Sequence, residues 1–142
     1  MPDDKKIVLQ FFLPMKPPTV TAQQHRISAR PGKKAQIYNT PELADAKQKF
    51  LSSLAAHVPE RPMQGPVRLV VKWMFPLLKG MKTCQYKATR PDTDNLQKLF
   101  KDCMTQAEFW HDDAQIASEI IEKFYNDIPG IYVHCEEIEA LP

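Results

Sequence analysis

At 142 residues, of which 43% are hydrophobic, the chain is long enough for one domain with a buried core and too apolar for wholesale disorder. The lack of any run of about 18 apolar residues excludes a membrane span, and three widely spaced cysteines exclude a disulfide framework. The net charge of +2 conceals a marked separation of basic and acidic segments. We therefore expect a single domain over residues 1–142, with reduced thiols, in the cytoplasm.

A first strand is predicted at residues 7–13, a segment rich in Ile, Val and Phe that Pro14 ends. Residues 16–39 are predicted to form a long polar loop. The loop contains no acidic residue, which indicates phosphate binding, with a solvated surface loop as the alternative. Its candidate DNA-binding residues are Lys16, Arg26, Arg30, Lys33 and Lys34.

A first helix is predicted from Pro41 to about His57. Thr40 is suited to the N-cap and Pro41 to the first helical position, and an acidic residue follows in the first turn. The prolines after His57 end the helix.

A second strand is predicted at residues 67–75, where every second residue from Val67 to Phe75 is apolar. Residues 77–89 lack periodicity and carry three lysines, which predicts a flexible loop that becomes ordered on DNA. This loop would deliver positive charge beside Asp92. The candidate DNA-binding residues here are Lys79, Lys82, Lys87 and Arg90.

Residues 90–116 form the most informative stretch, RPDTDNLQKLFKDCMTQAEFWHDDAQI. Apolar residues at helical spacing, from Leu96 to Ala107, predict an amphipathic helix. We expect Asp94 to be its N-cap and Asp92 to lie just before it, in extended chain that points the same way.

Asp92 and Asp94 therefore lie at the start of this helix, and Asp112 and Asp113 follow its end. Gathered carboxylates repel each other unless a cation or a proton intervenes, and Mg²⁺ and Mn²⁺ prefer oxygen ligands. One turn beyond Asp94, the ammonium group of Lys98 could contact a phosphate or a departing oxygen. The alternative is a polar helix face, which would be the better interpretation of a lone D-x-D pattern.

Two more strands are predicted at residues 115–125 and 131–139, joined as a hairpin by a five-residue loop at residues 126–130. The predicted order is β-α-β-α-β-β. It indicates an α+β fold in which one mixed four-stranded sheet has both helices packed on one face.

The pattern D-x-D-N-x-x-K, an amphipathic helix and then W-x-D-D-x-Q closely resembles the signature of the RusA family of Holliday-junction resolvases. The matching residues are Asp92, Asp94, Asn95, Lys98, Trp110, Asp112, Asp113 and Gln115. The resemblance implies that Asp92, Asp94 and Asp113 are catalytic and bind the metal, and that Lys98 is the functional lysine. It also implies a homodimer whose two active sites cut opposed strands of a four-way junction.

We therefore predict a Mg²⁺-dependent endodeoxyribonuclease, with Mn²⁺ as the alternative metal, that resolves Holliday junctions in recombination and repair in a bacterium or phage-infected cell. The metal would activate water, and Lys98 would stabilise charge on the phosphate or the leaving group. Asp112 is a candidate fourth acid, and Asp102 is either an acid of the site or a surface partner of Lys98. Two other functions stay open: a branched-DNA-binding module that has lost catalysis, and a nuclease for flaps or forks.

Overall fold

The computed structural model describes residues 5–19, 25–28, 36–39 and 41–139, with the backbone alone for residues 25–28 and 36–39. The helices are α1 (Pro41–Leu54) and α2 (Thr93–Gln106), together with two short 3-10 helices, η2 (Ala55–His57) and η3 (Asp113–Gln115). The strands are β1 (Val8–Pro14), β2 (His25–Ser28), β3 (Gln36–Asn39), β4 (Val67–Pro76), β5 (Gln85–Tyr86), β6 (Ile116–Asn126) and β7 (Gly130–Glu137).

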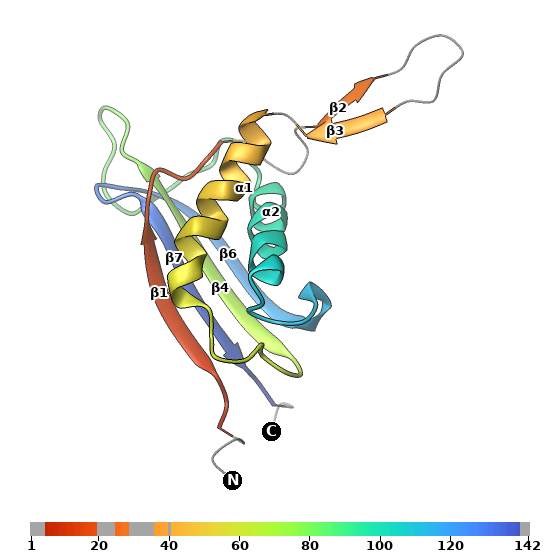
Figure 1. Cartoon of the computed structure of the whole chain (residues 1–142). Coiled ribbons are helices and arrows are strands. Elements are labelled where there is room, and N and C mark those ends of the chain that lie inside the picture. The colour runs from red at the N-terminus through yellow and green to blue at the C-terminus, as the bar shows by residue number, and fades with distance from the viewer. Residues whose placement is uncertain (1–4, 20–24, 29–35, 40, 140–142) are drawn as a thin grey trace.

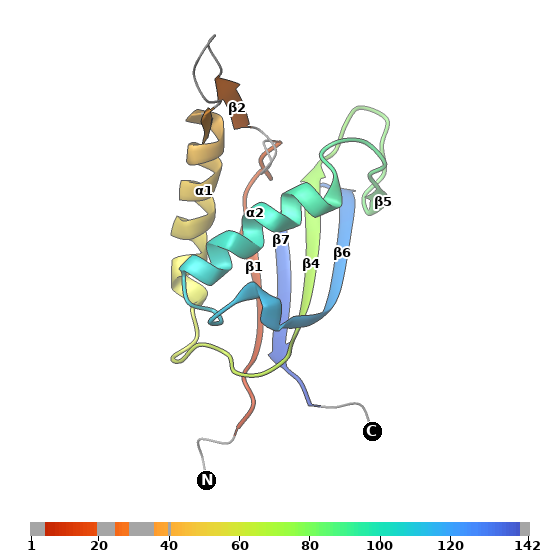
Figure 2. The ribbon, with the colours of Figure 1, turned by 90° about the vertical axis from the view of Figure 1, so that its right-hand side faces the viewer.

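Five of these strands form one mixed sheet in the order β1-β7-β4-β6-β5. β4 and β6 are parallel, with α2 in the connection between them, whereas the other neighbouring strands are antiparallel. Both helices cover the same face of the sheet (Figures 1 and 2). The predicted α+β fold, with a mixed sheet and the helices on one face, is confirmed.

The predicted count of four strands is wrong, and so is the predicted hairpin of the last two strands, because β4 lies between β6 and β7 in the sheet. β5 adds a fifth strand beside β6, and β2 and β3 pair with each other in a separate two-stranded sheet. All three strands lie in stretches predicted to be loops. β5 has two residues, too few for an alternating pattern to reveal it. Its contact with β6 instead includes the rings of Tyr86 and Phe124, whose centroids lie 4.7 Å apart.

The inner face of β4 anchors both helices, because every second residue from Val67 to Phe75 is buried. The ring of Trp73 lies 5.8 Å from that of Phe50 on α1 and 5.2 Å from that of Phe100 on α2. Phe50 and Phe100 lie 5.1 Å apart. Such aromatic pairs contribute about 0.5–1.5 kcal/mol each beyond the burial of their area. The cluster therefore fixes α2, whose N-terminus carries two of the predicted acids.

α1 and α2 have 14 residues each. Among the residues that the structure describes, no helix is long and apolar enough to cross a membrane.

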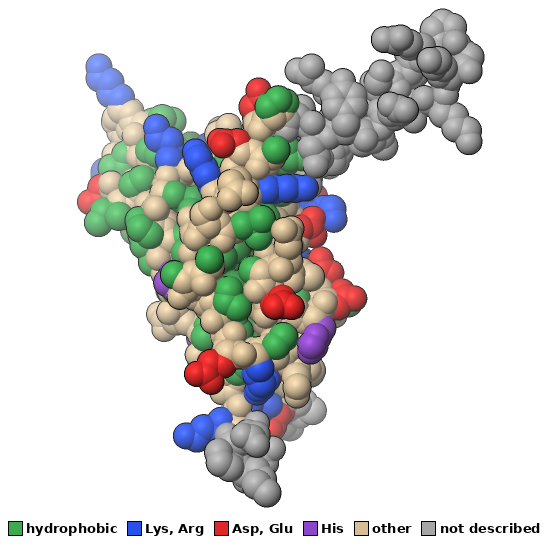
Figure 3. Space-filling view, viewed as in Figure 1, with side chains coloured by type: hydrophobic (Ala, Val, Ile, Leu, Met, Phe, Trp, Pro, Cys, Tyr) green, Lys and Arg blue, Asp and Glu red, His purple; other side chains and the backbone are tan. Residues whose placement is uncertain are grey.

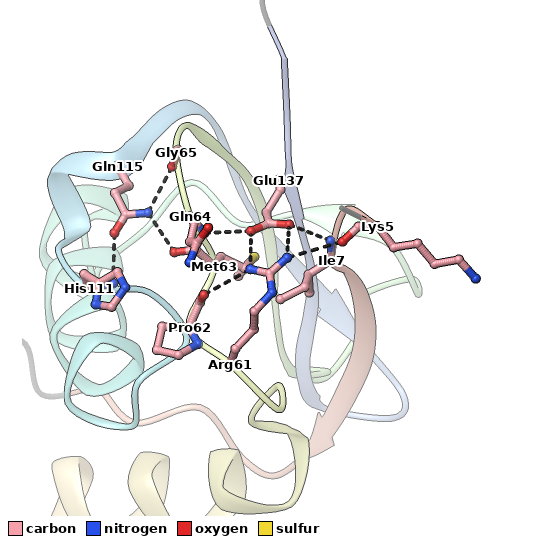
Figure 4. A network of polar contacts seen from close by, with 10 residues as sticks. All are labelled: Lys5, Ile7, Arg61, Pro62, Met63, Gln64, Gly65, His111, Gln115 and Glu137. Carbon is pink, nitrogen blue, oxygen red and sulfur yellow. Dashed lines mark hydrogen bonds and ion pairs between the residues drawn. The ribbon is translucent and has the colours of Figure 1, made fainter. Parts of the chain in front are cut away.

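Glu137, at the end of β7, connects three separate segments. It is 6% exposed and accepts hydrogen bonds from Nη1 (2.8 Å) and Nη2 (3.0 Å) of Arg61. The backbone N–H groups of Ile7 (2.8 Å) and Gln64 (2.6 Å) also donate to its carboxylate (Figure 4). The hydrogen bonds from Arg61 are the largest cause that lowers the pKa of Glu137, to about 2, against the opposing effect of burial.

Candidate active site

The N-terminus of α2 carries the first two predicted acids. The helix begins at Thr93, and Asp92 is its N-cap, with an extended backbone (φ −72°, ψ 146°) and no capping hydrogen bond from its side chain. The prediction that Asp94 is the N-cap is wrong by two residues, since the Asp92 carbonyl already accepts from the Leu96 N–H (3.1 Å). Both acids are exposed at the positive end of the helix dipole, where negative charge is favoured.

Lys123 on β6 holds the chain that leads into Asp92. Its Nζ donates to the carbonyl oxygens of Thr89 (2.7 Å) and Pro91 (2.8 Å). Burial, and next the charge of Lys87, lower the pKa of Lys123, whereas Asp92 acts in the opposite direction. Lys123 therefore lies within electrostatic range of Asp92. The sequence shows Lys123 only as a lone base among acids, so this contact is a site feature that sequence reasoning missed.

Lys87 reinforces the same loop, because its Nζ donates to Oγ1 of Thr89 at 2.8 Å. It also lies 5.1 Å and 5.0 Å from the ring centroids of Phe75 and Tyr125. The backbone N–H of Lys87 donates to the carbonyl of Lys123 (3.0 Å). The prediction of a flexible loop is therefore wrong for this part of residues 77–89, which is attached to β6 without DNA.

The two adjacent aspartates have different roles in the structure. Asp112 caps η3, since its Oδ1 accepts from the Ala114 N–H (2.8 Å) and the backbone N–H of Asp112 donates to Oε1 of Gln115 (3.1 Å). Nε2 of Gln115 donates to the carbonyls of Met63 and Gly65 (both 2.9 Å), which ties this turn to the loop before β4 (Figure 4).

The carboxylate of Asp113, by contrast, makes no hydrogen bond or ion pair with any residue that the structure describes. Trp110, 1% exposed, fixes the position of this turn against α2, because its Nε1 donates to Oγ1 of Thr105 at 2.7 Å. Phe109 is fully buried beside it, so the two aromatic side chains anchor this turn in the core. The fold thus uses Asp112 and leaves Asp113 available.

Asp94 and Asp113 line the same open pocket, which has a volume of about 270 Å³. The pocket lies between α2, η3 and β6, and its other lining residues are Gln97, Lys98, Lys101, Glu119 and Ile121. Asp92 is not part of this lining. Glu119 carries a carboxylate that sequence reasoning did not place at the site, and Nζ of Lys101 lies 3.2 Å from it.

Lys98 is paired with Asp102 one turn along α2, at 3.8 Å between Nζ and Oδ2. The two side chains are 67% and 45% exposed, and an exposed pair of this spacing contributes only about 0.3–0.5 kcal/mol. Asp102 therefore acts as the surface partner of Lys98 in this structure, and the pair is weak enough for Lys98 to leave it for a phosphate.

Comparison with known proteins bears on this arrangement. The profile of the family Endodeoxyribonuclease RusA matches residues 14–136. The chain belongs to the RusA family. It is 30% identical over 111 residues to the uncharacterized protein YqaN of Bacillus subtilis strain 168, covering 67% of this chain and 78% of that protein. It is 37% identical over 73 residues to a protein of Lactococcus phage r1t named crossover junction endodeoxyribonuclease rusA, covering 51% of this chain and 56% of the relative.

RusA-family nucleases are generally dependent on a divalent metal, and the donor chemistry of the pocket fits such an ion. Asp94, Asp113 and Glu119 offer hard carboxylate oxygens to one space. Within the described residues, however, no three His, Cys, Asp or Glu side chains lie close enough together to hold a metal ion. The predicted ligands Asp92, Asp94 and Asp113 are therefore not gathered into one metal site in this structure.

The predicted DNA-binding residues of this RusA-family chain fall into three groups. Lys16, Lys79, Lys82 and Arg90 are exposed, and within the described residues their side chains make no hydrogen bond or ion pair. Lys87 is half-buried and bonded, as described above. Arg26 is on β2, but its side chain lies outside the described residues, as do Arg30, Lys33 and Lys34. Figure 3 shows basic side chains over the upper part and at the lower end of the molecule, and acidic ones at the top and along the right-hand edge.

Proposed function

We propose that this protein is a divalent-metal-dependent endonuclease that resolves four-way DNA junctions, acting as one domain and as a homodimer. The observation that carries the proposal is the shared pocket of Asp94, in the first turn of α2, and Asp113, which follows the end of that helix in the sequence. Membership of the RusA family and the name of the phage relative support the choice of substrate. A two-fold dimer would match the two-fold symmetry of a junction that is cut symmetrically.

In this proposal Asp92, Asp94 and Asp113 hold the ion, and Asp112 does not. Mg²⁺, or Mn²⁺ in its place, supplies an activated water and neutralises charge on the phosphate when bound. Asp94 and Asp113 are suited to the task because their carboxylates have no competing partner among the described residues. Asp92 projects toward the ion from the N-cap of α2, and Lys123 holds the loop that precedes it.

Lys98 supplies the positive charge that the reaction needs on the side of the phosphate. It exchanges its weak pairing with Asp102 for the phosphate or the departing oxygen, where it stabilises the charge that develops in the transition state. The exposed bases Lys16, Lys79, Lys82 and Arg90 guide the arms of the junction by contacts with phosphates, which carry no sequence information.

The test compares three labelled substrates: a mobile four-way junction, a fork and a linear duplex, each with Mg²⁺ or with EDTA. We expect paired nicks in the junction alone, only with Mg²⁺, and none from Asp113→Asn. If the fork were cut as fast as the junction, the protein would be a nuclease with a broader activity on flaps or forks and not a dedicated junction resolvase. Junction binding with no cleavage by the wild type would identify a binding module instead.

A further inference from the structure

Gln97 has an orientation that its surroundings determine. It lies on α2, is 1% exposed, and its Oε1 accepts a hydrogen bond of 3.1 Å from Nε1 of Trp73. An indole N–H can only donate, so the amide oxygen must face Trp73 and the amide nitrogen must face elsewhere. Trp73 itself is fully buried between Phe50 and Phe100 and offers no alternative position. The direction of the Gln97 amide is thus set by chemistry.

The nitrogen of this amide has no partner. Among the side chains that the structure describes, Nε2 of Gln97 is the one buried nitrogen or oxygen atom without a hydrogen bond. Buried amide donors are almost always paired, because they have given up their bonds to water. An unpaired donor therefore either lowers the stability of the fold without serving any function, or forms its hydrogen bond with an acceptor that is absent from the free chain.

The position of Gln97 favours the second interpretation, because Gln97 lines the pocket that also contains Asp94 and Asp113. The missing partner must be an acceptor. Lys98 and Lys101 of the same pocket offer positive charge to an anion, against the carboxylates of Asp94, Asp113 and Glu119, which a bound metal ion would neutralise. The amide nitrogen is itself covered in this structure, so a ligand would reach it only after neighbouring side chains of the pocket wall move.

We propose that Nε2 of Gln97 donates to a non-bridging oxygen of the phosphodiester that enters this pocket, which makes Gln97 a substrate-binding residue beside Lys98. This assignment rests on the proposed nuclease function. The same donor could instead bind a carboxylate of the chain, Asp94 or Asp113, once a metal ion draws it inward. A phosphate oxygen would form the bond only when DNA is present, whereas a carboxylate oxygen would form it when the metal ion alone is bound.

The side-chain NH₂ resonances of ¹⁵N-labelled protein report on this bond directly. The Gln97 pair is identified as the pair that disappears in Gln97→Met. It is then followed on adding a short duplex in EDTA, Ca²⁺ alone, and both together. We expect a shift that requires DNA. A shift caused by Ca²⁺ alone, with no further change on adding DNA, would overturn the phosphate assignment in favour of a carboxylate. No shift in any of the three conditions would overturn the inference altogether.

A matched pair of variants gives a second measurement. Gln97→Glu keeps an oxygen toward Trp73 but replaces the donor by an acceptor, whereas Gln106→Glu adds the same charge at an exposed position of the same helix. At pH 8 we expect Gln97→Glu to cut the junction on the order of 10² times more slowly than wild type, and Gln106→Glu to match wild type. As the pH falls, the introduced carboxyl should regain a proton and, with it, part of the lost rate relative to wild type.

Equal rates for Gln97→Glu and Gln106→Glu would overturn the inference. The wild-type rate is scored separately, because it tests the proposed function and not Gln97. If the wild type cuts no DNA, the proposed function fails. If it cuts DNA while the Gln97 resonances do not respond, only the inference about Gln97 fails.

Discussion

Nζ of Lys123 donates a hydrogen bond of 2.8 Å to the carbonyl oxygen of Pro91, the residue immediately before Asp92. A second bond, of 2.7 Å, goes to Thr89. One side chain of β6 therefore fixes the backbone from which an acid of the site projects.

Lys123→Met should loosen this loop and misplace Asp92. We expect junction cleavage to fall by at least tenfold and junction binding to change little, because a displaced catalytic group costs rate more than affinity. Loss of hydrogen bonds from a charged donor should also lower stability by about 1–2 kcal/mol. Hydrogen exchange at residues 88–92 is the structural readout, and it should quicken. Lys72→Met, on β4, is the control, and exchange at residues 88–92 equal to that of the control would contradict the role of Lys123.

Asp112 and Asp113 should separate into a stability residue and an activity residue. Asp113→Asn is expected to abolish cleavage at unchanged stability, and so are Asp92→Asn and Asp94→Asn, with junction binding retained. Asp112→Ala should lower the free energy of unfolding by about 0.5–2 kcal/mol through loss of the cap, while it keeps measurable cleavage. Urea unfolding and single-turnover cleavage of each variant make the comparison. A stable but inactive Asp112→Ala protein would reverse the assignment.

The acid stability of the protein should depend on Glu137. Its pKa is about 2 in the folded state, below the value near 4.3 of an unfolded chain, so its contribution is fully present above about pH 4.5 and is lost as pH falls toward 2. The shift corresponds to about 3 kcal/mol. Glu137→Gln should therefore be less stable than wild type at pH 6, and the two unfolding curves should converge near pH 2. A difference that does not shrink with falling pH would exclude this origin.

Lys79 and Lys82 should contribute to DNA affinity, and Lys87 to the fold. Each lost phosphate contact reduces the slope of log K against log salt by about 0.9, so the Lys79→Ala/Lys82→Ala protein should show a shallower slope for junction and duplex alike. Lys87→Ala should instead reduce stability, because it removes contacts with Thr89, Phe75 and Tyr125. Titrations in Ca²⁺ at several salt concentrations, with thermal unfolding of the same proteins, separate the two effects. If the slope of log K against log salt were unchanged in the double variant, the DNA would not contact Lys79 and Lys82.

Local patterns predicted the long elements well. Alternation from Val67 to Phe75 and helical spacing from Leu96 onward are repeated many times, so β4 was placed to within one residue and α2 to within two. The N-cap was misplaced because D-T-D offers two acids that can cap, and only the backbone decides between Asp92 and Asp94. A single capping residue has no periodicity to support it.

The contacts that shape the site could not be predicted because they join distant segments. Lys123 is 32 residues from Pro91, and Gln97 is 24 residues from Trp73. No property of the residues alone marks Gln97 as having an unpaired amide, since its exposure depends on how α2 packs on β4. The pairing of Gln115 with the Met63 carbonyl, 52 residues away, likewise appears only in the folded chain.

The two ends of the described chain run side by side: the Glu137 N–H donates to the Ile7 carbonyl (2.9 Å), and Nζ of Lys6 lies 3.4 Å from the Glu139 carboxylate (Figure 1). Ends that meet can be joined by a short linker and the chain reopened at an exposed turn. The turn at Gly80 is such a place. A circular permutant opened there would carry its new termini on the loop of Lys79 and Lys82, so that an attached fluorophore would report on arriving DNA.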